Sequence, residues 1–372
     1  KYFLRVTNSM SKEIDSVYIA GADFSSLIGT EHAVIGIIDA GVINPGYATF
    51  VLRSENDILQ DNYQFNSIAE LKKAGKPLAV GVAAKKMHEK TNPNIKTIRP
   101  LRDGVIADFN ASELMIREFI KLINTKKRLF APNLKMVVCI PSGSTEVEIR
   151  AVRDSSEHAG GRDVYLIFEP MAAALGIGLD VEAPTGNMVV DIGGGTTEIA
   201  VISLGGIVAD QSIRVAGDVF TSEIQQYMRQ QHNIRIGEVT SEDIKIKIGA
   251  ATSDLDVMPE PYTVQGPNLM TAHPVEAMVT SPEIAHCLDK SIVKIEAAIL
   301  QVLENTPPEL YTDIVKKGIF LTGGGALLRG LDQRLSKKIN IPFHVSEDPL
   351  RAVARGTCIA LKNASSYNFL MR

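Results

Sequence analysis

The sequence predicts an α/β fold built from two duplicated halves, and three observations support this prediction. Predicted strands and helices alternate along most of the 372 residues, which is typical of an α/β protein with mixed sheets. An apolar run at 189–202 contains one aspartate and three consecutive glycines, and residues 37–41 repeat the beginning of this pattern in the first half. A second glycine turn, at 323–325, follows another short apolar strand.

The first half is predicted to contain five strands and three helices. Short apolar runs indicate strands at 34–39, 48–53, 78–81, 134–140 and 163–168. Apolar spacing near 3.6 residues indicates a helix at 110–123. Thr145 and Glu148 form a capping-box pattern, which predicts a second helix ending at Gly160, and small residues indicate a third helix at 171–178.

The second half is predicted to be richer in helix. The run at 189–202 is a strand, a tight turn and a second strand, and a glycine hairpin returns the chain as a strand at 207–213. Periodic apolar positions then indicate helices at 218–231, 241–250, 284–304 and 308–317. The last unit reads as a strand at 318–322, a helix at 326–338, a strand at 343–345 and a helix at 349–362. Residues 183–186 are the expected linker between the halves.

Composition excludes several functional classes. A net charge of −4 provides no basic surface for nucleic acid, so no nucleic-acid partner is expected. Cys139, Cys287 and Cys358 are too few and too scattered for a disulfide framework or a zinc site. No run of 18 apolar residues is present, so no membrane-spanning helix is expected. Hydrophobic residues make up 45% of the chain, which is enough to form a large core.

The first glycine turn has the chemistry of a phosphate-binding loop. Glycines let backbone N–H groups approach a phosphate closely, and Asp191 at the end of the first strand can hold Mg²⁺ through water. Thr196 and Thr197 add hydroxyl groups at the turn. An ordinary hairpin with a glycine turn is the alternative, because such a turn is a weak signal by itself.

The second glycine turn adds weight to the nucleotide interpretation. A short strand, the glycines 323–325 and a predicted helix N-terminus together form an anion seat, because N–H groups and the helix dipole point the same way. No Gly-Lys-Ser/Thr follows, so neither turn is a Walker A loop. The dinucleotide fingerprint would need a glycine where Leu328 stands, which argues against a dehydrogenase.

Several longer strings resemble the MreB family of bacterial actins, and the resemblance covers about residues 79–362. The strings lie at 98–108, 140–143, 169–174, 189–204, 321–328, 348–350 and 354–356. The resemblance implies an actin-like, duplicated ribonuclease-H-like ATPase fold with a nucleotide cleft between its halves. It implies an unplaced extension at 1–32, domain I at 33–182 plus 344–372, and domain II at 183–343.

The resemblance also implies roles for individual positions, with ATP and Mg²⁺ as cofactors. Asp39 and Asp191 would face the phosphates and the hydration shell of Mg²⁺ from opposite halves. The other implied nucleotide contacts are Gly41, Asn44, Gly193, Gly194, Gly195, Thr196, Glu242, Asp243, Ile244, Lys245, Gly324, Gly325, Ala326 and Leu327.

Glu169 is the expected catalytic residue, with Thr196 as its helper. It stands at a predicted strand end, where the family keeps the side chain that positions the attacking water. A carboxylate near the γ-phosphate can orient or deprotonate water. The alternative is that Glu169 only supplies a favourable negative charge at the start of the helix beginning near Pro170.

The first phosphate loop departs from the family pattern. After Asp39, Gly41 and Asn44, which fit, Val42 stands where the family has a hydroxyl and Pro45 removes a backbone donor. About three extra residues follow Asn44. Weaker ATP binding, or a scaffold of the same fold that polymerises without nucleotide, therefore stays open.

A basic and apolar segment predicts contact with a membrane surface. Its residues are Lys126, Lys127, Arg128, Leu129 and Phe130. Two apolar side chains can insert while the cations meet anionic lipid, at about 1.5–3 kcal/mol for each buried side chain. Binding would then depend on many subunits of a polymer acting together. The alternative is a basic helix end whose Leu-Phe pair packs into the core.

The resemblance implies an ATP-dependent filament on the cytoplasmic face of the inner membrane that guides cell-wall synthesis. Its partners would be further copies of the chain, the membrane surface, and the wall-synthesis and shape proteins of the elongation machinery. The alternatives are a scaffold insensitive to nucleotide, a monomeric ATPase or sugar kinase, and a chaperone ATPase. No sugar-kinase motif is visible, and the chain ends near the last helix of the fold.

Overall fold

The computed structural model describes the backbone of residues 76–102, 104–123 and 133–372, and of short strands at 16–19, 22–23, 32–37, 52–54, 57–58 and 68–71. The loop carrying Asp39, Gly41, Asn44 and Val42 lies outside the described residues, as does the segment 126–130. No helix in the described part is both long and apolar enough to cross a membrane.

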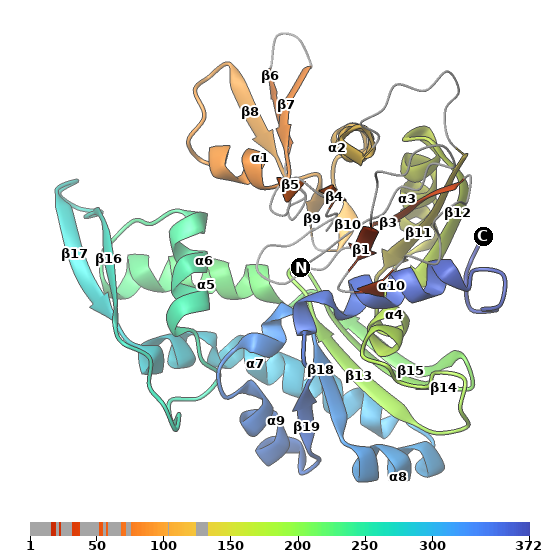
Figure 1. Cartoon of the computed structure of the whole chain (residues 1–372). Helices are drawn as coiled ribbons and strands as arrows, with labels where there is room; N and C mark the ends of the chain where they lie inside the picture. Colours follow the sequence, from red (N-terminus) through yellow and green to blue (C-terminus); the bar gives the residue numbers. More distant parts are fainter. Residues whose placement is uncertain are drawn as a thin grey trace.

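A parallel three-stranded sheet organises the first half of the molecule (Figure 1). Its strand order is β12-β11-β3, and β11 pairs in parallel with both neighbours. Most residues of the three strands are apolar. Four helices pack with this half: α2 (Phe109–Ile123), α3 (Glu146–His158), α4 (Glu169–Gly176) and α10 (Ala352–Lys362). The strands are β3 (His32–Ile37), β11 (Asn133–Ile140) and β12 (Gly161–Phe168).

A mixed five-stranded sheet organises the second half, in the order β15-β14-β13-β18-β19. β13 pairs with β14 in antiparallel fashion and with β18 in parallel fashion. The strands are β13 (Asn187–Ile192), β14 (Thr197–Ser203), β15 (Gly206–Ile213), β18 (Ile319–Thr322) and β19 (Phe343–Val345). The helices are α5 (Gly217–Gln231), α6 (Glu238–Ile248), α7 (Ser281–Glu304), α8 (Pro308–Lys317) and α9 (Leu331–Ile339).

The two halves repeat one supersecondary unit. In the first half β11, α3 and β12 form a strand–helix–strand unit with parallel strands, and β18, α9 and β19 form the same unit in the second. In each half a helix follows this unit, α4 in the first and α10 after the second. The duplication expected from the repeated aspartate–glycine pattern is therefore visible in the topology.

Two smaller lobes project from the halves, one at the top and one at the left of Figure 1. The first, here called the α1 lobe, joins the antiparallel sheet β7-β6-β8 to α1 (Val82–Met87); its strands are β6 (Ile68–Leu71), β7 (Lys76–Val80) and β8 (Ile95–Ile98). The second, here called the α6 lobe, consists of α5, α6 and the hairpin of β16 (Tyr262–Pro267) and β17 (Pro274–Val279).

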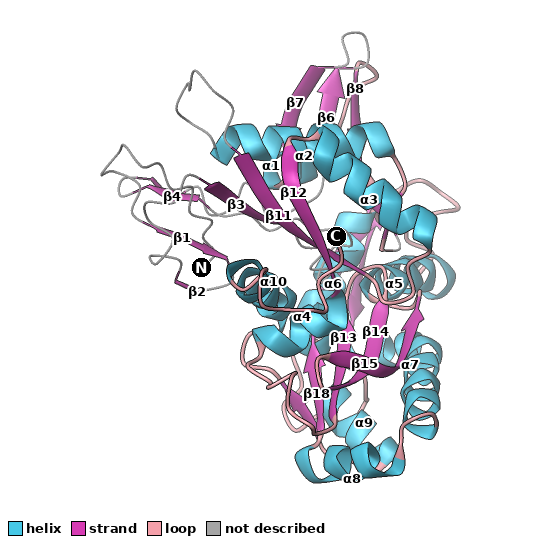
Figure 2. Ribbon diagram, turned by 90° about the vertical axis from the view of Figure 1, so that its right-hand side faces the viewer, coloured by secondary structure: helices cyan, strands magenta, loops and turns pink. Residues whose placement is uncertain are grey.

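The remaining strands are short. They are β1 (Ser16–Ile19), β2 (Ala22–Asp23), β4 (Leu52–Ser54), β5 (Asp57–Ile58), β9 (Leu101–Arg102) and β10 (Val105–Ile106). Figure 2 shows β1 to β4 on the side of α10 and the two larger sheets above and below α4 and α10.

The strands β13 and β14 are buried on both faces, so their side chains alternate between two hydrophobic cores. Val189, Ala200 and Ile202 belong to the first core. Val190 and Ile199 belong to the second core, on the opposite face of the sheet. Asp191 and Glu198 share the face directed toward the first core, because they are two residues from Val189 and Ala200.

The helices α4 and α10 cross at a contact between two glycines. A Cβ atom on Gly176 would lie 1.7 Å from the carbonyl oxygen of Ala352, and one on Gly356 would lie 1.7 Å from that of Ala172. Each glycine therefore contacts the residue that lies four positions before the other glycine in the sequence. This reciprocal backbone contact joins the equivalent helices of the two halves.

Two predicted helices differ from the structure, and one observed hairpin was not predicted. The helix expected at 326–338 is a 3₁₀ helix, η2 (Gly324–Leu327), separated from α9 by Gly330, whose φ of 70° interrupts the helix. The helix expected at 349–362 begins as η3 (Pro349–Arg351). The strand expected at 34–39 is present as β3 (His32–Ile37), and positions 38 and 39 lie outside the described residues. The hairpin of β16 and β17 was not predicted, because prolines and a glycine weaken its strand pattern.

Candidate functional site

The turn between β13 and β14 is fixed against the start of α5. The N–H of Gly193 donates to the Thr196 carbonyl at 2.8 Å, which closes the turn. The carbonyls of Gly193 and Gly194 then accept from the N–H groups of Gly217 (3.1 Å) and Asp218 (2.8 Å). The predicted strand–turn–strand is confirmed, and its loop is held rigidly by the first turn of a helix.

Asp191 lies where the two glycine turns meet. It is 3% exposed, at the end of β13, and its Oδ1 accepts from the hydroxyl of Thr322 at 2.9 Å. β18 runs parallel to β13 with Asp191 paired to Thr322, so both strands end at the same edge of the sheet. A Cβ on Gly323 would lie 2.6 Å from Asp191 Oδ1, and its φ is 73°, so this position requires glycine.

The implied nucleotide contacts at 324–327 pack directly on the strand end that carries the first turn. A Cβ on Gly325 would lie 2.1 Å from Cγ2 of Ile192, which explains the glycine there. Gly324, Gly325 and Ala326 are buried, and Leu327 is 49% exposed. Two motifs 130 residues apart in the sequence are thus neighbours at one sheet edge.

Lys245 lies against the same loop from α6. Its Nζ donates to the carbonyl of Gly217 and to the hydroxyl of Thr221, both at 2.8 Å. A Cβ on Gly217 would lie 3.4 Å from Lys245 Nζ and 3.4 Å from the Cα of Gly194. Lys245 is therefore close to the glycine loop, and two of its three N–H donors already bind protein acceptors.

The other predicted residues of α6 have different surroundings. Glu242 is 3% exposed and forms an ion pair with Lys85 at 3.2 Å. Ile244 is buried completely in the second hydrophobic core, so its side chain serves packing. Asp243 is half-buried. Glu242 and Lys245 share one face of the helix because they are three residues apart.

Burial shifts the pKa values of three charged groups beside the loop. Loss of solvent raises the pKa of Glu242 to about 7 and that of Asp218 to about 6. The same cause lowers the pKa of Lys245 to about 8. Perturbed ionisable groups that gather at one place are typical of functional sites.

Glu169 is the first residue of α4 and directly follows the last residue of β12. It is 4% exposed, and α4 packs on β13 and β14, the strands that carry the glycine turn. Its place in the first turn of the helix also fits the alternative interpretation, a favourable charge at the N-terminus. Its catalytic role stays a prediction.

Thr196 and Thr197 differ in their contacts. The side chain of Thr196 hydrogen-bonds Glu198, and a Cβ on Gly104 would lie 2.9 Å from Cγ2 of Thr196. The hydroxyl of Thr197 instead donates to the carbonyl of Val215 at 2.7 Å, so it braces the loop. Thr196 is therefore the threonine that faces the neighbouring half.

Glu198 is a residue that motif analysis missed. It is completely buried, accepts from both the N–H and the hydroxyl of Ser142 at 2.9 and 2.8 Å, and accepts from the hydroxyl of Ser212 at 2.6 Å. Burial raises its pKa. The sequence signal that could have identified Glu198 is a carboxylate inside an otherwise apolar strand. A carboxylate buried there needs hydrogen-bond partners, because burial without them is costly.

The capping box expected at the start of α3 is present. The hydroxyl of Thr145 accepts from the N–H of Glu148, and the carboxylate of Glu148 accepts from the N–H of Thr145 at 2.7 Å. The carboxylate of Glu148 also accepts from the hydroxyl of Thr145 at 2.8 Å, and the two bonds that it accepts from Thr145 lower its pKa. The capping interpretation of this residue is confirmed.

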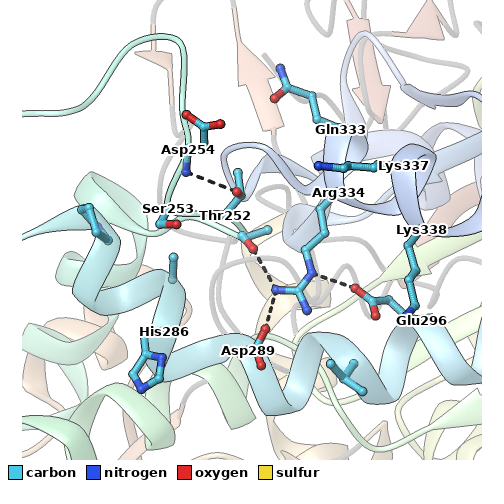
Figure 3. A pocket seen from close by; sticks show the side chains of 14 residues that line it. Thr252, Ser253, Asp254, His286, Asp289, Glu296, Gln333, Arg334, Lys337 and Lys338 are labelled. Atoms are coloured by element: carbon cyan, nitrogen blue, oxygen red, sulfur yellow. Dashed lines mark hydrogen bonds and ion pairs between the residues drawn. The ribbon is translucent and has the colours of Figure 1, made fainter.

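A pocket of about 800 Å³ lies apart from these residues, between α7, α9 and the segment 251–254 (Figure 3). Arg334 crosses it and binds Glu296 at 2.7 Å, Asp289 at 2.9 Å and the carbonyl of Ala251 at 2.9 Å. None of the predicted site residues lines it. Its charged groups largely neutralise one another.

Comparison with known proteins decides the family. A sequence model described as MreB/Mbl protein matches residues 39–368. The chain belongs to the MreB/Mbl family. It is 47% identical over 292 residues to the cell shape-determining protein Mbl of Bacillus subtilis strain 168, covering 78% of this chain and 86% of that one. Against the cell shape-determining protein MreB of Escherichia coli K12 it is 47% identical over 293 residues, covering 78% and 84%.

Solved structures confirm the actin-like fold. MreB5 of Spiroplasma citri bound to AMPPNP superposes with a TM-score of 0.78 at 34% identity, covering 89% of this chain and 96% of that one. The ADP-bound form of MreB5 gives 0.79 at 34% identity, with 90% and 98% covered. A MamK double helical filament gives 0.67 at 17% identity and supports the fold alone. The predicted family and fold are thus confirmed, and the MreB/Mbl chain is an actin-like member of a family of cell shape proteins.

Proposed function

We propose that this MreB/Mbl chain binds ATP between its halves, polymerises head to tail into filaments, and hydrolyses ATP slowly. One observation carries the proposal: the loop 193–196, the motif 324–327 and the pair Glu242 and Lys245 gather around one edge of the second sheet. Its relative MreB5, at 34% identity, was solved with both AMPPNP and ADP. The geometry and the relative point to the same ligand.

The chemistry of the site fits a nucleoside triphosphate. The glycine loop at the start of α5 offers N–H groups and the positive end of a helix dipole. Asp191 would hold Mg²⁺ through water together with Asp39, and the metal would offset the charge of the phosphates. Gly41 and Asn44 would belong to the opposite phosphate loop. Glu242 and Lys245 would contact the ribose and base.

For hydrolysis, we assign Glu169 to orient the attacking water and Thr196 to assist it. Both side chains are more than nine-tenths buried, which removes competing bulk water and strengthens electrostatic effects. Glu198, bonded to Thr196 and Ser142, would hold the threonine in position across the two halves. Slow turnover coupled to the filament is part of this proposal.

Filament assembly and membrane contact follow from the family and the sequence. Head-to-tail contacts that do not close on themselves produce an open polymer. The segment 126–130 would anchor such a polymer to the inner face of the cytoplasmic membrane, where cell-wall synthesis proteins would be its partners. We propose the domain boundaries 33–182 plus 344–372 and 183–343; the second hydrophobic core lies within 183–343, whereas the first core also includes Val189, Ala200 and Ile202 of β13 and β14.

A second function, a scaffold that polymerises without nucleotide, is favoured by one sequence feature. Val42 and Pro45 remove two hydrogen-bond donors from the first phosphate loop. Each missing donor would weaken phosphate binding.

High-speed sedimentation separates the two functions. The protein is spun with Mg-ATP, with ADP and without nucleotide, in parallel with the variants Asp191→Ala and Asp163→Ala. Asp163 is an exposed aspartate on β12 and serves as the matched control. We expect an ATP-dependent pellet for the parent and for Asp163→Ala, and at least several-fold less pellet for Asp191→Ala.

The other outcomes are equally informative. Equal pellets in all three conditions would establish the scaffold and contradict nucleotide-dependent assembly. No pellet in any condition would overturn the filament proposal for this chain.

A further inference from the structure

The α1 lobe and the α6 lobe meet through charged side chains. Lys85 of α1 pairs with Glu242 of α6 at 3.2 Å, and His88 Nε2 lies 3.4 Å from Glu238 Oε2. The N–H of Glu238 donates to the carboxylate of Glu89 at 3.1 Å. Among the described residues, neither hydrophobic core includes members from both lobes. Separating the lobes would therefore cost electrostatic energy and little apolar burial.

Arg99 is the centre of this contact. It follows β8 directly, and its side chain is 12% exposed. One end of its guanidinium pairs with Glu238 and the other with Asp218 at 3.3 Å. Glu238 is the first residue of α6 and Asp218 is the second of α5, so one arginine holds two helix N-termini.

These contacts reach the proposed nucleotide site directly. The backbone N–H of Asp218 donates to the carbonyl of Gly194 in the glycine loop. Glu242, the partner of Lys85, is the proposed ribose contact. Glu238, Glu242 and Lys245 are spaced four and three residues apart, so one face of α6 serves both the lobe contact and the site.

Solvent exposure distinguishes these pairs from ordinary surface ion pairs. Exposed ion pairs contribute little to stability, because water and salt screen their charges. The side chains of Arg99 and Glu242 are 12% and 4% exposed, and their partners Asp218, Glu238 and Lys85 are 27%, 31% and 24% exposed, so water reaches these pairs only in part. Burial also raises the pKa of Glu242 and Asp218 and lowers that of Lys85, although the opposite charges act against these shifts.

We propose that the pairs Lys85–Glu242, Arg99–Asp218 and Arg99–Glu238 form a charged latch that closes the two lobes over bound nucleotide and sets how fast the nucleotide leaves. The latch rests on the proposed function, because it presupposes a nucleotide at Glu242 and the glycine loop. In this arrangement Arg99 and Lys85 are positioning residues: they act on the site through Asp218 and Glu242.

The test measures the dissociation rate of a fluorescent ADP chased with excess unlabelled ATP. We compare the parent with Arg99→Leu, Glu238→Gln and the double variant. We expect release on the order of 10-fold faster for Arg99→Leu, because loss of a buried charged partner acts mainly on dissociation. Glu238→Gln should have a smaller effect, since Arg99 keeps Asp218, and the double variant should be no faster than Arg99→Leu alone.

Arg117→Leu is the matched control. Arg117 pairs with Glu113 on α2 and donates to the carbonyl of His158, its side chain is 49% exposed, and neither of these partners belongs to either lobe. Its release rate should equal that of the parent. Release from the parent should respond only weakly to added salt, because partly buried ion pairs are screened much less than exposed ones.

Three results would count against the proposal. Unchanged release from Arg99→Leu, or a double variant that releases faster than Arg99→Leu alone, would overturn the latch while leaving nucleotide binding intact. A parent that binds no labelled nucleotide would overturn the proposed function itself.

Discussion

Replacing Gly356 by alanine (Gly356→Ala) is expected to destabilise the protein by about 3 kcal/mol or more. The added Cβ would lie 1.7 Å from the carbonyl oxygen of Ala172, 2.6 Å from its carbonyl carbon and 2.9 Å from the nitrogen of Gly176. These are backbone atoms, so no side-chain rotation relieves the clash. The two helices would have to separate, which opens space inside the first core.

Thermal unfolding of the nucleotide-free protein measures this effect. Gly176→Ala should behave similarly, because its Cβ would lie 1.7 Å from the carbonyl oxygen of Ala352. Gly206→Ala is the control: its Cβ would meet only the Ser203 carbonyl oxygen at 3.7 Å, an ordinary contact. Melting temperatures of Gly356→Ala and Gly206→Ala that agree within error would show that the crossing is looser than described.

Replacing Glu169 by alanine (Glu169→Ala) is expected to lower ATP turnover roughly 10²–10⁴-fold while ATP binding is retained. The carboxylate is 4% exposed at the junction of β12 and α4, on an element that packs on β13 and β14. Removing it deletes the group assigned to orient water and leaves the glycine loop untouched. Phosphate release and equilibrium binding of a fluorescent ATP analogue are measured on the same preparation.

The control for Glu169 is another carboxylate in the first turn of a helix. Glu146 occupies that position in α3 and is exposed. Glu146→Ala loses a similar charge–dipole interaction, so it should lower stability slightly and leave turnover unchanged. Turnover of Glu169→Ala within two-fold of the parent would mean that Glu169 only stabilises α4, the alternative raised by its sequence position.

The two expected effects are connected through α4. This helix begins at Glu169 and ends at Gly176, so the glycine crossing with α10 sets the height of the carboxylate above the second sheet. Both helices belong to the first hydrophobic core, so a change in this crossing would move the start of α4, and Glu169 with it, relative to β13 and β14.

Local patterns in the sequence were enough for most of the fold. The run 189–202 predicted β13, its glycine turn and β14, because period, turn residues and a terminal aspartate agree with one another. The capping box at Thr145 predicted the start of α3 for the same reason. The prediction was wrong where the chain uses short or irregular elements, as at η2, Gly330 and the β16–β17 hairpin.

Parts of the site were equally readable from the sequence. Asp191, the glycines 193–195 and the motif 324–327 were identified as two separate phosphate-type turns. Their roles for ATP came from resemblance to MreB and stay proposals. The sequence did not reveal Glu198, Arg99 or Lys85, since each acts through residues more than 50 positions away.

By itself, the sequence determined the α/β class, the duplicated aspartate–glycine turns and the family. These depend on the period of apolar residues, on the residues of each turn and on contiguous sequence strings, all of which are local. Only the tertiary structure decided that the two turns share one sheet edge, that Gly176 and Gly356 meet, and that Arg99 and Lys85 bridge two lobes. The physical reason is that strand order, helix crossing and ion pairing depend on distances between residues far apart in the chain. Those distances are set by packing of the two cores together.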